Sequence, residues 1–127
     1  MPATFTISAD GSYLIETDIG EHTPQMQREL INELLAKMQA TGLVKVLIDA
    51  RTHRAPPSSV DAFYLWQEFV PRIPRGAKFA VVVGWEWKGF NFTETVAVNR
   101  GINARYFNDE DTAVTWLRGA MSTPSDG

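Results

Sequence analysis

The chain contains no cysteine among its 127 residues and only two histidines. The missing thiols exclude disulfide scaffolds, zinc sites built on thiolates and catalysis by a cysteine nucleophile. With so few histidines, no cluster has metal-ligand spacing, and we predict neither a metal site nor a cofactor. A cysteine-free chain also suits the reducing cytoplasm.

Long apolar segments are missing as well. No run approaches the roughly 20 residues that a membrane-spanning helix requires. Residues 1–10 lack the basic segment and following apolar stretch of an export signal. An excess of positive charge is also absent, because the net charge is −3, and this disfavours nucleic acid as a partner. We therefore expect a cytoplasmic protein that does not span a membrane.

What the chain does have is the composition of a globular protein. Its hydrophobic content is 44%, with four tryptophans and seven phenylalanines. A chain of this length buries roughly two-thirds of its unfolded surface in one core. We expect a single domain over residues 1–119 and a polar, disordered tail over residues 120–127.

Apolar patterning predicts five strands, at residues 4–8, 12–18, 43–50, 77–84 and 104–107. Asp10-Gly11 separates the first two and suits a tight hairpin turn with positive φ angles. The 43–50 and 77–84 segments are almost continuously apolar, which predicts strands covered on both faces.

Residues at helical spacing predict four helices, over residues 23–42, 58–70, 91–101 and 108–119. Thr23 would cap the first and Gly42 would stop it. Pro71 would block the second. Asn108 would cap the last helix, and the three acids that follow it would stabilise the positive end of the helix dipole. The inward side chains of this helix would be Ala113, Trp116 and Leu117.

The order of these elements predicts an α/β domain with an N-terminal β-hairpin. Its mixed sheet would hold about five strands, flanked by the four helices. The later strands should be parallel, because parallel neighbours require crossover connections of one hand.

Three stretches carry a resemblance to a known family: the strand "VLIDAR", the segment "ETVAVNRG" and the ending "ARYFNDEDTAVTWLRG". Over roughly residues 3 to 119 the chain resembles the SpoIIAA-like branch of the STAS fold, also labelled STAS/SEC14. The resemblance implies a STAS-like fold and a bacterial regulatory protein. Better-studied STAS relatives, the anti-sigma-factor antagonists, are phosphorylated by a partner kinase on a serine that starts the helix after the third strand. Ser58 or Ser59 would hold that place here, although "RTHRAPP" separates them from the strand.

The polar residues that follow the strands define a candidate site. Ligands of open parallel sheets bind outside the carboxyl ends of the strands. We therefore predict a partner- or ligand-binding site at that edge, formed by Asp49, Arg51, His53, Arg54, Trp85 and Trp87.

Ser58 and Ser59 allow three interpretations. A serine at this position can simply cap the helix. It can be a phospho-acceptor, because negative charge is favoured at a helix N-terminus that arginines flank. As a nucleophile it would need His53 as its base and Asp49 to orient that base.

Trp85 and Trp87 alternate in the segment after the 77–84 strand. Their rings would either close the core or present an aromatic anchor to a partner. Arg72 and Arg75 precede the same strand and lie at the opposite edge, so they cannot extend the site into a basic stripe.

These features support three hypotheses about function. The first is a non-enzymatic interaction or regulatory module, of open pathway, that docks a protein partner or a second copy through the Ser58 helix and the Trp85/Trp87 segment. The second is a binder of a small anion or lipid head group near Arg51, His53 and Arg54. The third, a serine hydrolase, needs an assembled catalytic triad.

Overall fold

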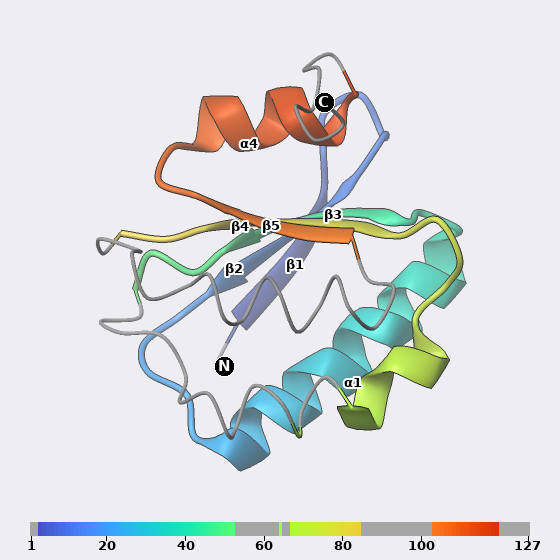
Figure 1. Cartoon of the computed structure of the whole chain (residues 1–127), viewed down its shortest axis with the longest axis vertical. Coiled ribbons are helices and arrows are strands. Elements are labelled where there is room, and N and C mark those ends of the chain that lie inside the picture. The colour runs from blue at the N-terminus through green and yellow to red at the C-terminus, as the bar shows by residue number, and fades with distance from the viewer. Residues whose placement is uncertain (1–2, 53–63, 65–66, 85–102, 120–127) are drawn as a thin grey trace.

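The protein is represented by a computed structural model, which describes residues 3–52, 64, 67–84 and 103–119. A five-stranded sheet forms its middle layer (Figure 1). Helix α1 (Pro24–Thr41) lies on one face of the sheet and helix α4 (Glu110–Leu117) on the other. Within the described residues, no helix is long and apolar enough to cross a membrane.

The strands lie in chain order across the sheet: β1 (Ala3–Ile7), β2 (Leu14–Asp18), β3 (Lys45–Asp49), β4 (Lys78–Val82) and β5 (Asn103–Phe107). Strand β1 is antiparallel to β2, and every later pair is parallel. The predicted hairpin, mixed sheet and strand count are confirmed. The carboxyl ends of β2 to β5 consequently meet at one edge.

The turn of the hairpin is longer than predicted. The Ser8 N–H donates to the Tyr13 carbonyl at 2.9 Å, which leaves a four-residue loop between them. Only Gly11 in this loop has a positive φ, of 76°. A two-residue turn of type I′ would also need a positive φ at Asp10. The Asp10 carboxylate instead accepts hydrogen bonds from the Ser8 and Ser12 hydroxyls, and these bonds stabilise the wider loop.

Helix α1 begins and ends as its sequence predicts. The Thr23 hydroxyl accepts the Met26 N–H at 3.1 Å. Gly42 adopts the left-handed conformation, with φ 75°, and its N–H donates to the Met38 carbonyl at 2.8 Å. Glycine terminates helices this way because it lacks the Cβ that penalises positive φ. The buried face of the helix holds Leu30, Leu34 and Met38.

The prediction that the second helix ends near Pro71 is confirmed. The α-helical residues 67–69 are followed by a 3₁₀ turn, η1 (Val70–Arg72), that includes Pro71. Proline is tolerated in the first turn because its missing N–H has no helical acceptor there. The predicted start of this helix and the whole predicted helix at 91–101 lie outside the described residues, as does the tail.

Asp109, and not Asn108, caps helix α4. The Asp109 carboxylate accepts the Thr112 N–H at 2.8 Å and also the Thr112 hydroxyl. The Asn108 side-chain amide instead donates to the carbonyl of Val83, which follows the neighbouring strand β4, at 3.2 Å. Asparagine and aspartate cap helices about equally well, so the sequence alone cannot choose between adjacent candidates.

The core lies on both faces of the sheet. On the α1 face, Val46 packs with Leu14, Leu34, Met38 and Phe79. On the α4 face, the next residue, Leu47, packs with Ala80, Val82, Trp116 and Leu117. Because Val46 and Leu47 are both at most 2% exposed, β3 is covered on both faces, as its continuous apolar sequence predicts.

Candidate functional site at the carboxyl edge

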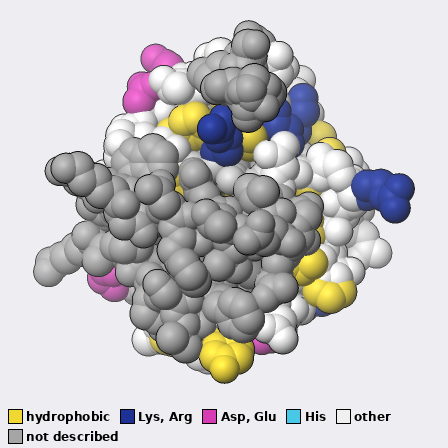
Figure 2. Space-filling view, in the orientation of Figure 1, with side chains coloured by type: hydrophobic (Ala, Val, Ile, Leu, Met, Phe, Trp, Pro, Cys, Tyr) yellow, Lys and Arg dark blue, Asp and Glu magenta, His cyan; other side chains and the backbone are white. Residues whose placement is uncertain are grey.

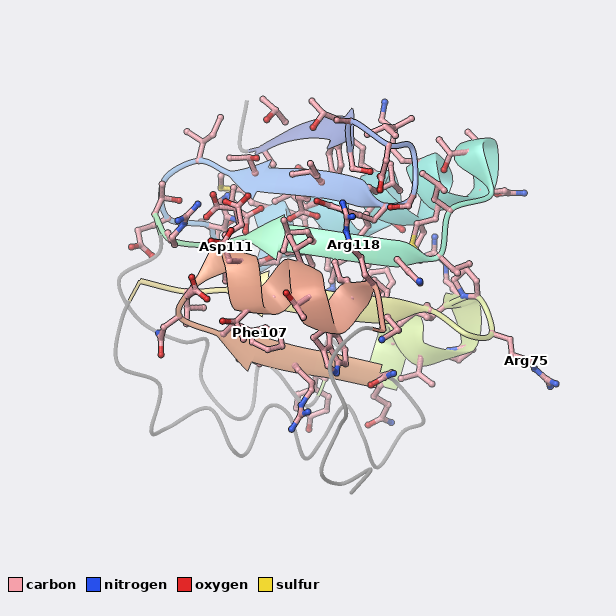
Figure 3. All side chains as sticks on the ribbon, turned by 90° about the horizontal axis from the view of Figure 1, so that it is seen from above. Arg75, Phe107, Asp111 and Arg118 are labelled. Atoms are coloured by element: carbon pink, nitrogen blue, oxygen red, sulfur yellow. The ribbon has the colours of Figure 1, made fainter. Side chains whose placement is uncertain are left out.

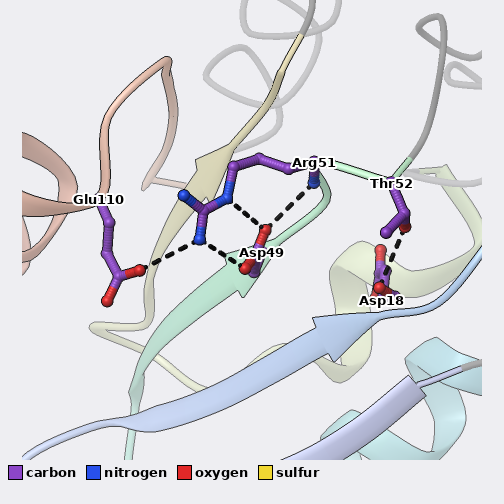
Figure 4. A network of polar contacts seen from close by, with 5 residues as sticks. All are labelled: Asp18, Asp49, Arg51, Thr52 and Glu110. Atoms are coloured by element: carbon purple, nitrogen blue, oxygen red, sulfur yellow. Dashed lines mark hydrogen bonds and ion pairs between the residues drawn. The ribbon is translucent and has the colours of Figure 1, made fainter.

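Asp49 and Arg51 form the centre of the described carboxyl edge. Asp49 is the last residue of β3, and Arg51 turns back over it. The Arg51 guanidinium makes two hydrogen bonds to the Asp49 carboxylate: Nε donates to Oδ1 at 2.9 Å, and Nη2 donates to Oδ2 at 2.8 Å (Figure 4). The Arg51 backbone N–H adds a third bond, to Oδ1 at 3.1 Å. This paired geometry fixes the direction of the arginine side chain.

Glu110 extends this pair to the helix layer. It lies in the first turn of α4, and its Oε1 accepts from Arg51 Nη2 at 3.2 Å (Figure 4). Arg51 therefore bridges the end of β3 to the start of α4. The Arg51 and Glu110 side chains are 45% and 54% exposed, so water screens their attraction.

These contacts shift the pKa values of both Asp49 and Arg51. The hydrogen bond from the Arg51 side chain lowers the pKa of Asp49, against an opposing effect of burial. The same bond raises the pKa of Arg51 further above its usual range. Both residues stay charged at neutral pH, and the guanidinium is already occupied by carboxylates.

Two further contacts hold the segment after β3 against its neighbours. The Thr52 hydroxyl donates to the Asp18 carbonyl at 3.0 Å, which connects this segment to the end of β2 (Figure 4). Gly84, just after β4, passes so close that a Cβ there would lie 3.2 Å from the Arg51 carbonyl oxygen. A glycine therefore permits the close approach of the two chain segments.

Two acidic residues of this region were missed by the sequence analysis. Glu16 and Asp18 on β2 are 5% and 4% exposed. Burial, followed by the hydrogen bond with the Asp18 side chain, raises the pKa of Glu16 well above its ordinary value. The signal was available: Glu16 and Asp18 come two and four residues after Leu14, so the alternation of a strand places them on its buried face.

The structure brings together only part of the predicted site. Asp49 and Arg51 are in contact, and the positions of His53, Arg54, Ser58, Ser59, Trp85 and Trp87 lie outside the described residues. Arg75 lies at the opposite edge from Asp111 of α4 (Figure 3). On the described part of the face in Figure 2, Lys and Arg side chains are scattered and form no continuous stripe.

The described residues include no group of three or more histidine, aspartate and glutamate side chains that could hold a metal ion. The chemistry that the edge does offer is a row of charged, partly exposed side chains on a fixed backbone. Such a row can recognise the surface of another molecule through complementary charge.

Comparison with known proteins gives one family and one fold. The family model described as SpoIIAA-like matches residues 14–118. A solved structure of an uncharacterized protein of the DUF3478 family with a SpoIIAA-like fold, from Shewanella loihica PV-4, is similar with a TM-score of 0.55. The two chains are 20% identical over 91% of each, a likeness that shows the fold alone. No curated protein matches the chain.

Proposed function

Because the chain belongs to the SpoIIAA-like family, we propose that it is a non-enzymatic interaction module of the bacterial cytoplasm whose carboxyl edge docks a protein partner. The observation that carries this proposal is the bridge from Asp49 through Arg51 to Glu110. It fixes charged groups from two layers of the domain at one rim. A pre-organised rim loses little side-chain entropy when another surface binds it.

The same bridge favours a protein over the alternative of a small anion or lipid head group. An anion at Arg51 would compete with the two-point contact to Asp49 at 2.8 and 2.9 Å. It would also approach three acids at the start of α4, namely Asp109, Glu110 and Asp111. Displacing a paired carboxylate leaves that charge without its partner, which costs binding free energy.

Site-specific photo-cross-linking in cells tests the docking rim. A photoreactive amino acid replaces Asp111, which is exposed at this edge, and in a matched chain it replaces Arg75, which is exposed at the opposite edge (Figure 3). We expect one recurrent protein to be cross-linked from position 111 and not from position 75. Trp87→Ala in the position-111 chain should reduce its yield. Equal yields from the two positions would contradict the proposal.

Two in vitro measurements address the alternatives. Thermal shift with inorganic phosphate and soluble lipid head groups should leave the midpoint unchanged, and a shift that Arg51→Ala abolishes would favour the anion site. A fluorophosphonate probe should label neither Ser58 nor Ser59. Labelling of either serine would favour a hydrolase, since the probe reacts with activated serine nucleophiles.

A further inference from the structure

Glu16 is a carboxyl group placed inside an apolar layer. In the sheet it lies between Phe5 of β1 and Ile48 of β3, which are its direct neighbours. Its side chain faces α1, because Leu14, two residues earlier, packs against Leu34 of that helix. At 5% exposure, an ionised Glu16 would lose most of its hydration, whereas the neutral acid would lose little.

A second carboxyl group, that of Asp18, lies beside Glu16 on the same face. It is 4% exposed, and its side chain is hydrogen-bonded to that of Glu16. Two carboxylates in contact repel each other, and neither can donate a hydrogen bond unless one keeps its proton. Burial, the bond to Asp18 and the charge of Asp18 all raise the pKa of Glu16 above its ordinary value of 4.5.

The nearby charge that acts on this pair is also negative. Glu33 of α1 further raises the pKa of Glu16, and β1 has no ionisable side chain. The other charged or titratable groups of the described flanking elements are Glu21 and His22 before α1, Arg28, Glu29 and Lys37 on α1, Glu68 and Arg72 beside α1, and Lys45 and Asp49 on the opposite face of β3.

We propose that Glu16 keeps its proton where it lies buried beside Asp18, and that this buried pair is a pH-sensitive latch that seats α1 on the N-terminal hairpin. With the proton in place, the Glu16 carboxyl group is neutral and can donate a hydrogen bond to Asp18. When the proton leaves to solvent, Glu16 gains a negative charge beside Asp18 and beneath a helix that brings Glu33 close. Hydrating this charge requires α1 to loosen from β2.

The sign of the pH dependence follows from the raised pKa. Below pH 4.5 the carboxyl group is protonated in both the folded and the unfolded chain, so burial carries no ionisation penalty. Above that value the unfolded chain loses the proton while the folded chain keeps it. Stability therefore falls as the pH rises, about tenfold in the folding equilibrium constant per pH unit, until the folded Glu16 also ionises.

Urea unfolding of the wild type and Glu16→Gln between about pH 5 and pH 8 tests the latch. Glutamine keeps the shape and the donor but never ionises. We expect the wild-type folding constant to fall with pH over this range and that of Glu16→Gln to stay nearly flat and exceed it at the upper end. In the wild type, the Leu34 methyl NMR signals should shift with the same titration, and in the variant they should not.

A control variant isolates the pair. Glu29→Gln removes an exposed carboxylate from α1. It should keep the wild-type slope. Parallel curves for wild type and Glu16→Gln would overturn the proposal. Should Glu16→Gln fail to fold, the ¹³C signal of the wild-type Glu16 carboxyl decides: titration near its ordinary value would equally overturn the latch.

Discussion

Lys78 connects the sheet to the end of α4 through one side chain. Its Nζ donates to the Trp116 carbonyl at 2.8 Å and lies 4.3 Å from the centre of the Trp116 ring. A cation is favoured at this position because the carbonyl belongs to the negative end of the helix dipole. Partial burial, followed by the charge of the neighbouring Lys45, nevertheless lowers the pKa of Lys78. The contacts with Trp116 therefore offset part of a desolvation cost.

Replacing Lys78 by methionine should destabilise the domain by about 1 kcal/mol, because the stem still packs while the hydrogen bond and the cation are lost. The measurement is the free energy of unfolding in urea. Lys45→Met is the matched control, since it removes a charge from the adjacent position of β3 without removing a contact to Trp116. Equal losses in the two variants would contradict a specific role for Lys78.

At the scale of elements, α4 is held by a short buried face and a capped start. Ala113, Trp116 and Leu117 are at most 2% exposed, and Trp116 lies 5.7 Å from Phe107 of β5 between ring centres. The Asp109 carboxylate accepts one of the free N–H groups in the first turn, that of Thr112. An eight-residue helix is too short to be stable alone, so this packing and capping decide whether it forms.

Trp116→Ala should lower the free energy of unfolding by about 3 to 5 kcal/mol, because it leaves a cavity between α4 and the sheet. Chemical denaturation followed by circular dichroism measures the loss. Thr115→Ala, on the exposed side of the same helix, should change stability by no more than about 0.5 kcal/mol. An unchanged unfolding midpoint for Trp116→Ala would rule out the observed packing of α4.

Asp109→Asn should flatten the acid side of the stability curve. The Thr112 hydroxyl and N–H lower the pKa of Asp109 below 3.8 in the folded chain. The ionised cap therefore stabilises the fold above that pH, and this contribution is lost as the pH falls through the folded pKa. Asparagine still caps the helix at neutral pH but cannot titrate. Urea unfolding at several acidic pH values should show a shallower slope for the variant, and Asn108→Ala should retain the wild-type slope.

Elements were predictable where the sequence contained one dominant local signal. Thr23-Pro24 at the start and Gly42 at the end set the bounds of α1 correctly. Where two residues of similar chemistry were adjacent, as at Asn108 and Asp109, tertiary contacts decided: the Asn108 amide is taken by the Val83 carbonyl. Pro71 was also a reliable signal, because the α-helical residues 67–69 end before it and only a short 3₁₀ turn includes it.

At the scale of the whole molecule, the parallel order of β2 to β5 gathers the strand ends and the start of α4 at one edge. That much of the candidate site follows from the sequence, because a strand ending in Asp49 and an acid-rich helix start were both visible in it. The hydrogen bonds of Arg51 with Asp49 and Glu110 were not predictable from the sequence, since residues 51 and 110 come together only through the fold. Glu16 and Asp18 were missed as buried residues because glutamate and aspartate side chains are usually exposed.

The bridge between layers should contribute little to overall stability. A double-mutant cycle of Arg51→Ala and Glu110→Ala should give a coupling energy below about 1 kcal/mol, because both side chains are about half exposed. The coupling should shrink further in concentrated salt. A coupling above about 2 kcal/mol would mean that the network is more shielded from water than its exposure indicates.

Strand β1 is the outermost of the described strands on its side of the sheet, and its sequence, ATFTI, contains neither charge nor proline. Natural sheets commonly protect such borders with lysine, proline or a bulge, because unpaired backbone groups there can recruit another chain into the sheet. Thr6 is exposed on this strand. Thr6→Lys should therefore raise the concentration at which the protein stays soluble, without changing the core.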